Sequence, residues 1–239
     1  MGRDSSNKKM EPNQYTSGIM ILASTIDKHG MSISDELKLD INYIISSEKP
    51  VNIIETGTYL GLGSTKTILE SIVLNDIEDA SFTSIEANKW FYLTAKKHLK
   101  EYEYIKGFRL INSISIPRIL IPKEVENNLP ENVITDHLVA DDYLKETDFD
   151  CPHDGLGFAM SLIKNKPDLV ILDSAGHLGT IEFHYLMSMV DSSFILILDD
   201  TLHRKHFKTM EYLRSDERFT ILKESKNKFG YAICKYHHQ

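Results

Sequence analysis

The chain contains few cysteines and no long run of apolar residues. Only Cys151 and Cys234 occur among its 239 residues, far apart and without the spacing of a metal-binding motif. Two such thiols build no disulfide framework, and we expect Cys234, which lies in an apolar stretch, to be buried. The sequence also lacks the apolar core of a signal peptide and any stretch long enough to span a bilayer. We therefore expect a protein of the reducing cytoplasm, without a membrane partner.

An excess of positive charge is missing as well. The 27 lysines and arginines are outnumbered by 35 aspartates and glutamates, which gives a formal net charge of −8. This balance argues against a general affinity for nucleic acids or anionic membranes. One basic cluster, His203–His206 with Lys208, is interpreted as a solvated helix face.

Apolar runs alternate with helical segments along most of the chain. Runs of Ile, Leu and Val without polar alternation predict strands that are buried on both faces, as in a parallel sheet. The expected strands cover 51–55, 81–86, 108–112, 167–173 and 194–199, followed by a close pair at 219–224 and 230–236. The first expected helix is opened by a capping box at Ser32-Ile-Ser-Asp35 and stops before Pro50, and the others cover 64–74, 88–102 and 203–214. The fold class is therefore α/β: a doubly wound, mostly parallel, seven-stranded Rossmann-like sheet with an antiparallel C-terminal hairpin.

Two segments do not follow this alternation of strands and helices. Residues 1–16 are polar and aperiodic, and we expect a disordered arm there, followed by a single domain over 17–239. Residues 116–160 contain four prolines and an acidic run, and this stretch is too long for an ordinary connection. We interpret it as an insertion that forms a lid over the strand ends.

The strongest local signal is a glycine-rich turn between the first strand and the next helix. It reads Glu55-Thr-Gly-Thr-Tyr-Leu-Gly-Leu-Gly-Ser-Thr65, with glycines at 57, 61 and 63. Such a turn lets the backbone approach a ligand closely, and open α/β sheets bind ligands beyond the carboxyl ends of their strands. The alternative is that the glycines only permit tight packing of strand against helix.

The glycine spacing differs from the dinucleotide fingerprint, and the turn lacks the lysine of a phosphate-binding loop. The turn resembles motif I of the class I methyltransferases, in which an acidic residue precedes such glycines. The resemblance implies S-adenosylmethionine (SAM) as cofactor, with Glu86 at the end of the second strand binding the ribose. The residues predicted to bind the cofactor are Glu55, Gly57, Thr58, Tyr59, Gly61, Gly63, Ser64, Glu86 and Asp173. The aromatic run 90–92 forms either an adenine wall or, as we favour, part of the core.

Carboxylates also end the fourth and fifth predicted strands. Asp173 ends one strand, and Asp199 with Asp200 ends the other, so all three should meet at the edge that carries the glycine turn. Three gathered carboxylates repel one another unless a cation intervenes, and oxygen ligands suit Mg²⁺. The alternative is that Asp200 or Thr201 only caps the helix that follows.

The block 167–200 is similar to the metal-dependent O-methyltransferases, and to the group that contains macrolide-sugar O-methyltransferases and cephalosporin-hydroxylase-type proteins. The resemblance implies that Asp173, Asp199 and Asp200 bind a divalent cation and that His177 is the catalytic base. That histidine lies three residues after the aspartate in the family but four here, so His203 competes for the role. Glu182 and His184 are interpreted as parts of a helix face.

Together these patterns predict a SAM-dependent methyltransferase that uses a divalent metal to methylate a hydroxyl of a small molecule, such as a sugar. A homo-oligomer is compatible with the sequence. Two alternatives stay open: a non-catalytic nucleoside-binding module, and a metalloenzyme like cephalosporin hydroxylase on the same fold.

Overall fold

The computed structural model describes residues 33–123, 130, 133, 150–174 and 177–239. The predicted arm at 1–16 and most of the predicted insertion lie outside the described residues. No helix in the described part is long and apolar enough to cross a bilayer. Residues Ile33–Gln239 form one compact unit by their internal contacts.

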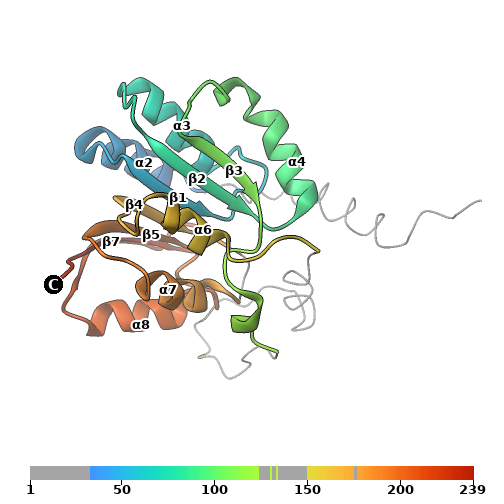
Figure 1. The fold of residues 1–239 in the computed structure, drawn as a ribbon. Coiled ribbons are helices and arrows are strands. Elements are labelled where there is room, and N and C mark those ends of the chain that lie inside the picture. Colours follow the sequence, from blue (N-terminus) through green and yellow to red (C-terminus); the bar gives the residue numbers. More distant parts are fainter. Residues whose placement is uncertain (1–32, 124–129, 131–132, 134–149, 175–176) are drawn as a thin grey trace, which may run out of the picture. The chain divides into compact units, whose positions relative to one another are not determined.

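A seven-stranded sheet lies at the centre of this unit (Figure 1). Its strands are β1 (Asn52–Thr56), β2 (Ser81–Glu86), β3 (Phe108–Asn112), β4 (Leu169–Leu172), β5 (Phe194–Asp199), β6 (Phe219–Ser225) and β7 (Tyr231–Tyr236). They lie in the order β3-β2-β1-β4-β5-β7-β6. The pairs β5–β7 and β7–β6 are antiparallel, and the other pairs of these strands are parallel. The doubly wound, mostly parallel sheet with a C-terminal antiparallel hairpin is therefore confirmed.

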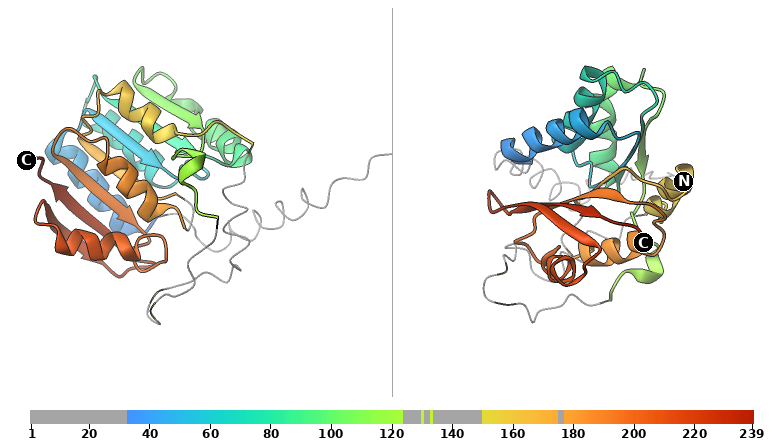
Figure 2. Two further views of the ribbon diagram at one scale, coloured as in Figure 1. Left: turned by 60° about the horizontal axis from the view of Figure 1, so that its bottom comes forward. Right: turned by 90° about the vertical axis from the view of Figure 1, so that its left-hand side faces the viewer.

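Six α-helices cover the two faces of the sheet (Figures 1 and 2) among the residues that the structure describes. They are α2 (Asp35–Glu48), α3 (Ser64–Leu74), α4 (Lys89–His98), α6 (Gly155–Leu162), α7 (Gly179–Met187) and α8 (Phe207–Ser215). One core cluster joins α2, α3 and α4 to one face, and a second joins α6, α7 and α8 to the other.

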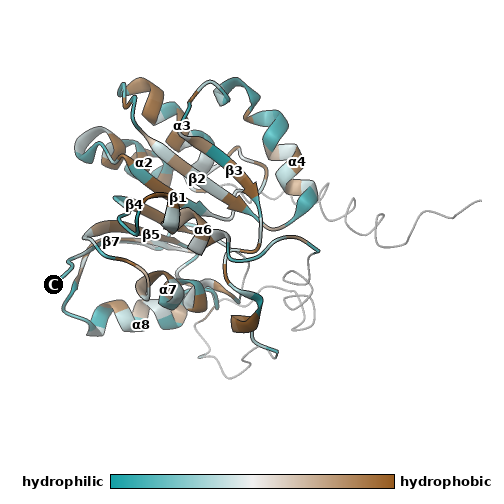
Figure 3. Ribbon diagram, viewed as in Figure 1, coloured by the Kyte–Doolittle hydropathy of each residue, from teal (hydrophilic) through white to brown (hydrophobic). Residues whose placement is uncertain are grey.

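Burial along the strands explains why these residues form this sheet. From its second residue to its last, β1 is buried, and all of β4 is buried, because both strands lie between helices on each side. The edge strand β6 instead alternates buried and less buried positions, and its outer side lacks a neighbouring strand. Figure 3 shows that helices such as α4 and α8 carry both polar and apolar residues.

Two predicted boundaries are wrong. The helix expected at 203–214 begins at Phe207, because residues 200–206 form turns in which the His206 amide donates to the His203 carbonyl at 3.2 Å. Residues 155–160 of the predicted insertion belong to α6, whose Leu156 and Met160 are buried against the sheet. The connection between β3 and β4 therefore includes an ordinary crossover helix.

Gly57 gives a test of how tightly the strand ends approach one another. Its φ is +83°, and a Cβ there would clash with the carbonyl oxygen of Asp173 at the end of β4. We expect Gly57→Ala to lower the free energy of unfolding by about 2–4 kcal/mol, from the left-handed backbone and the overpacking. Denaturant unfolding measures this.

Gly63→Ala is the matched control. Its φ is −93°, and the nearest atom to an added Cβ is 3.7 Å away, so we expect a smaller loss. Equal losses in the two variants would contradict the assignment of close packing to Gly57.

Candidate active site

The parallel strands bring the predicted residues to one edge of the sheet. β1 pairs with β2 and β4, and β4 pairs with β5, all in parallel, so their carboxyl ends lie side by side. The chain turns outward from β1 in opposite directions, towards β2 on one side and β4 on the other. This is the switch point at which open α/β sheets bind ligands.

The glycine-rich turn is held between β2 and β4. The Gly57 amide donates to the Ile85 carbonyl at 2.9 Å, and the Gly61 amide donates to the Thr58 carbonyl at 2.9 Å. An added Cβ at Gly61 would lie 2.9 Å from Leu99 Cδ1. Gly57 and Gly61 therefore also permit close packing, whereas Gly63 has room beside it, and no side chain of the described residues caps the first turn of α3.

Glu55 lies buried beneath this turn. Its Oε2 accepts hydrogen bonds from the hydroxyls of Thr65 at 2.6 Å and Ser84 at 2.5 Å, which ties β1 to α3 and β2. Its Oε1 has no hydrogen-bond partner among the described residues. Burial raises the pKa of Glu55 to about 7, and the hydroxyls of Ser64, Ser84 and Thr65 oppose that rise. Glu55 supports the turn from below.

Glu86 ends β2 beside the turn, as predicted. Its Oε2 accepts from the Tyr59 amide and its Oε1 from the Asn88 amide, both at 2.7 Å. Burial raises the pKa of Glu86 to about 7. A carboxylate oxygen has two lone pairs, so each oxygen retains acceptor capacity for a ligand hydroxyl.

The aromatic run after β2 does not pack into the core as a whole. Trp90 is 43% exposed, which contradicts the favoured core interpretation. Phe91 instead meets the ring of Tyr59 edge-on, with ring centroids 4.6 Å apart. One aromatic pair thus flanks the glycine turn on the side of α4.

Glu182 is a buried carboxylate whose burial the sequence does not reveal. The sequence pattern predicts a helix face for it, but its side chain is fully buried and bonds to residues that follow or end β4 and β1. Its Oε2 accepts from the hydroxyls of Thr56 at 3.0 Å and Ser174 at 2.8 Å. The Thr56 hydroxyl oxygen in turn accepts from the Asp173 amide at 3.2 Å. Burial raises the pKa of Glu182. His184 is exposed, as expected.

The three predicted aspartates do come together, but around a lysine. Lys205 Nζ lies 2.5 Å from Asp173 Oδ1 and 2.8 Å from Asp200 Oδ2. Although burial lowers the pKa of Lys205, the three carboxylates raise it further, so the amine is charged. Burial raises the pKa of Asp173 to about 6, although the charge of Lys205 partly offsets this rise. The pKa of Asp199 is raised by burial and by the neighbouring charges of Asp173 and Asp200.

The basic cluster is therefore not a solvated helix face, as the sequence suggested. His203, Lys205 and His206 are all buried. His206 Nε2 lies 3.1 Å from the Leu172 carbonyl, to which only a protonated nitrogen can donate. Burial and the charge of Lys205 lower the pKa of His206, so the ring is neutral. The basic composition of residues 203–206 does not indicate that the side chain of Lys205 is buried.

The two candidate bases lie in different settings. Burial, reinforced by the charge of Arg204, lowers the pKa of His177 to about 4, which makes it a weak proton acceptor. His203 is 4% exposed, and its Nδ1 faces the Lys205 amide at 3.4 Å. Both histidines are at least partly buried, so neither is a freely solvated side chain.

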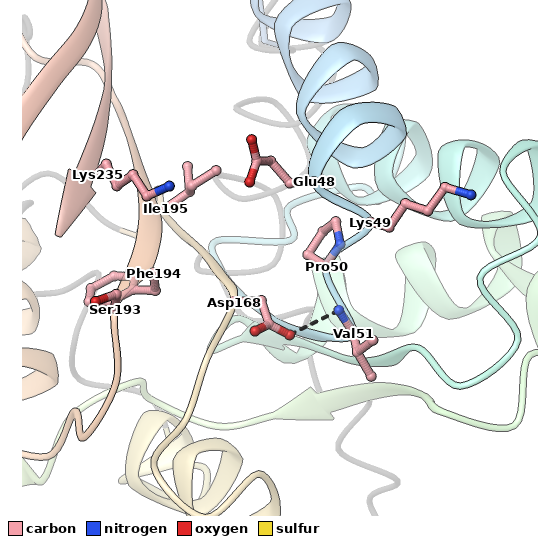
Figure 4. Close-up of a pocket in the computed structure, with 9 residues that line it drawn as sticks. All are labelled: Glu48, Lys49, Pro50, Val51, Asp168, Ser193, Phe194, Ile195 and Lys235. Carbon is pink, nitrogen blue, oxygen red and sulfur yellow. Dashed lines mark hydrogen bonds between the residues drawn. The ribbon is translucent and has the colours of Figure 1, made fainter. Parts of the chain in front are cut away.

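A cavity of about 330 Å³ lies at the opposite edge of the sheet (Figure 4). Its lining includes Pro50, Phe194 and Lys235, at the starts of β1 and β5 and near the end of β7. Asp168 also lines it and accepts from the amide of Val51 at 2.9 Å. This cavity contains none of the predicted site residues.

Comparison with known proteins identifies the fold. No family model and no curated protein matches the chain. Solved structures do match, including an O-methyltransferase from Bacillus cereus in complex with SAH, which is 10% identical with a TM-score of 0.57 over 97% of this chain and 94% of that one. The O-methyltransferase TomG from Streptomyces achromogenes, involved in tomaymycin synthesis and solved with SAM, is 12% identical with a TM-score of 0.57 over 98% and 94%. A methyltransferase from Geobacter sulfurreducens is 11% identical with a TM-score of 0.58 over 96% and 93%. The chain has the fold of the class I methyltransferases.

The acidic cluster of this methyltransferase fold does not fit a divalent cation. The Lys205 ammonium bonds to the oxygens of Asp173 and Asp200 that such an ion would need, and it would repel a second cation there. Within the described ranges, no group of three or more His, Cys, Asp or Glu side chains is arranged to hold a metal ion. The aspartates meet at the ends of β4 and β5, as the resemblance implied, but the sequence did not predict that Lys205 would lie between them.

Glu55 predicts how the stability of this methyltransferase fold depends on pH. Its pKa is about 7 in the fold and 4.5 without it, so its contribution is complete below pH 4.5 and is lost as the pH rises to 7. For a shift of this size the loss is at most about 3 kcal/mol. We expect Glu55→Gln to flatten the fall in melting temperature between pH 5 and pH 8.

The exposed Glu78 provides the control, because Glu78→Gln should leave the slope unchanged. If the melting temperature of Glu55→Gln falls with pH as steeply as that of the unmodified protein, Glu55 does not cause the pH dependence.

Proposed function

We propose that the protein is a SAM-dependent methyltransferase that methylates an oxygen atom of a small molecule. The observation that carries the proposal is the meeting of the glycine-rich turn and the Glu86 carboxylate at the switch point between β1 and β4. The fold, which the chain shares with O-methyltransferases solved with SAM or SAH, supports it.

The residues at this edge fit a nucleoside cofactor. Glu86 offers carboxylate oxygens to a ribose diol, and its bond to the Tyr59 amide holds it against the turn. No side chain of the described residues caps the first turn of α3, so backbone N–H groups there would be available to a ligand. Glu55 adds a buried oxygen without a hydrogen-bond partner among the described residues. Glu86 would therefore bind the ribose, while residues 57–64 would line the rest of the cofactor.

The bound cofactor would supply a methyl group on a sulfonium sulfur. The acceptor oxygen would take this methyl group, and the electron pair of the broken carbon–sulfur bond would stay on sulfur. The hydroxyl proton must go to a protein group or to solvent. Asp173 suits this role better than His177, because it lies beside the turn, its side chain is 21% exposed and its pKa is about 6.

A small, uncharged or weakly charged acceptor fits the composition of the chain. The net charge of −8 disfavours a nucleic acid substrate, and the carboxylates at the strand ends disfavour an anionic acceptor. Hydroxyl groups of such an acceptor would bond to Asp173 and Asp200, whose side chains are partly exposed.

Titration calorimetry with SAM tests the proposal. We expect binding to the unmodified protein, and a loss of about 10- to 100-fold in affinity for Glu86→Ala, since bonds to a charged acceptor contribute about 1.5–3 kcal/mol. The affinity should rise between pH 6 and pH 8, because Glu86 ionises near pH 7 and its ionised form accepts more strongly. In Glu86→Gln this rise should be much smaller.

Glu101→Ala, an exposed change in the short 3-10 helix Lys100–Tyr102 that follows α4, should bind SAM as the unmodified protein does. If the protein binds no SAM at any pH tested, the proposal is wrong. Binding of SAM without methyl transfer to any hydroxyl compound in an acceptor screen would favour a nucleoside-binding module instead.

A further inference from the structure

Three carboxylates meet at the ends of β4 and β5, and such a group needs a positive charge. Asp173 and Asp200 both contact the same ammonium, and Asp199 lies close enough to both for their charges to raise its pKa. Oxygen clusters of this composition commonly bind a divalent ion. Here the positive charge comes from the chain itself.

Lys205 occupies the position between the carboxylates. Its side chain is 4% exposed, whereas those of Asp173 and Asp200 are 21% and 31% exposed. The lysine side chain is therefore more buried than those of the two aspartates that it contacts. Two of its three N–H groups are used by Asp173 and Asp200, and no third partner is found among the described residues.

The surrounding fold is built to hold this lysine. Asp200 has a φ of +61°, a left-handed conformation that turns the chain back beneath the strand end. His206, next in sequence, is bonded to the Leu172 carbonyl, which fixes the segment against β4.

Gly179, at the start of α7, makes room for the lysine stem. A Cβ at this position would lie 2.5 Å from Lys205 Cγ and 2.7 Å from His206 Cε1. The ion pairs are thus not a chance contact of a flexible surface side chain, because a glycine and a strained aspartate both accommodate them.

We propose that Lys205 is the permanent cation of this acidic cluster, so that the site works without a divalent metal ion, and that its removal converts the cluster into a divalent-cation site. The inference goes beyond the proposed function and does not depend on it. An ammonium that is part of the chain balances the carboxylates at any metal concentration. Without it, the partly buried carboxylates are left unbalanced, and a bound divalent ion relieves their repulsion.

Titration with Mn²⁺ tests this directly on the protein without cofactor or acceptor. We expect no saturable Mn²⁺ binding by the unmodified protein, by calorimetry or by the electron spin resonance signal of free Mn²⁺. Lys205→Ala should bind one Mn²⁺ at least about 10-fold more tightly, which corresponds to about 1.4 kcal/mol. Its melting temperature should fall relative to the unmodified protein and recover as Mn²⁺ is added.

Three further variants control the interpretation. Lys205→Met keeps the methylene stem without the charge and should also gain Mn²⁺ binding. Adding Asp200→Asn to Lys205→Ala should abolish the gain, because one ligand oxygen is lost. Lys96→Ala, at an exposed position on α4, should gain nothing.

Two results would overturn the inference. One is saturable Mn²⁺ binding by the unmodified protein that Asp173→Asn abolishes, since the ammonium would then not exclude the metal. The other is that Lys205→Ala and Lys205→Met fold but bind no Mn²⁺, or that both variants stay unfolded even when Mn²⁺ is present. Neither result bears on SAM binding, so the proposed function stands or falls separately.

Discussion

Burial of charge at one edge of the sheet constrains this whole region of the molecule. Glu55, Glu86 and Glu182 are all buried there, and desolvation raises the pKa of each. Each is kept in place by hydroxyl or amide donors from a neighbouring element, so the acids also connect β1, β2, α3 and α7. Lys205 is the buried cation that balances the aspartates beyond them.

The order of the strands explains why so many acids gather here. Residues separated by more than a hundred positions, such as Thr56 and Asp173, become neighbours because β1 and β4 pair in parallel. Ligand-binding groups can then be supplied by loops after β1, β2, β4 and β5. The apolar clusters on both faces fix the strands, and the ionisable groups of the candidate site lie at or near the strand ends.

Much of this arrangement could be predicted from the sequence, because apolar runs determine parallel strands and parallel strands determine which ends meet. The positions of Glu86, Asp173 and Asp199 at one edge followed from that reasoning. The inward turn of Lys205 could not be predicted, since it depends on the left-handed backbone of Asp200 and on the bond from His206 to β4. The burial of Glu182 was hidden for a similar reason: its partners Thr56 and Ser174 come from other elements, and a helical pattern does not show which face meets them.

Gly179 also has a consequence for how this chain can change over evolutionary time. Its missing side chain leaves the space through which the stem of Lys205 passes, so the two positions form one steric unit across α7 and the loop before α8. Any larger residue at 179 would push the amine out of the aspartates, and a shorter residue at 205 would free position 179 to grow. Substitutions at these two positions are therefore expected to occur as a pair in descendants of this chain.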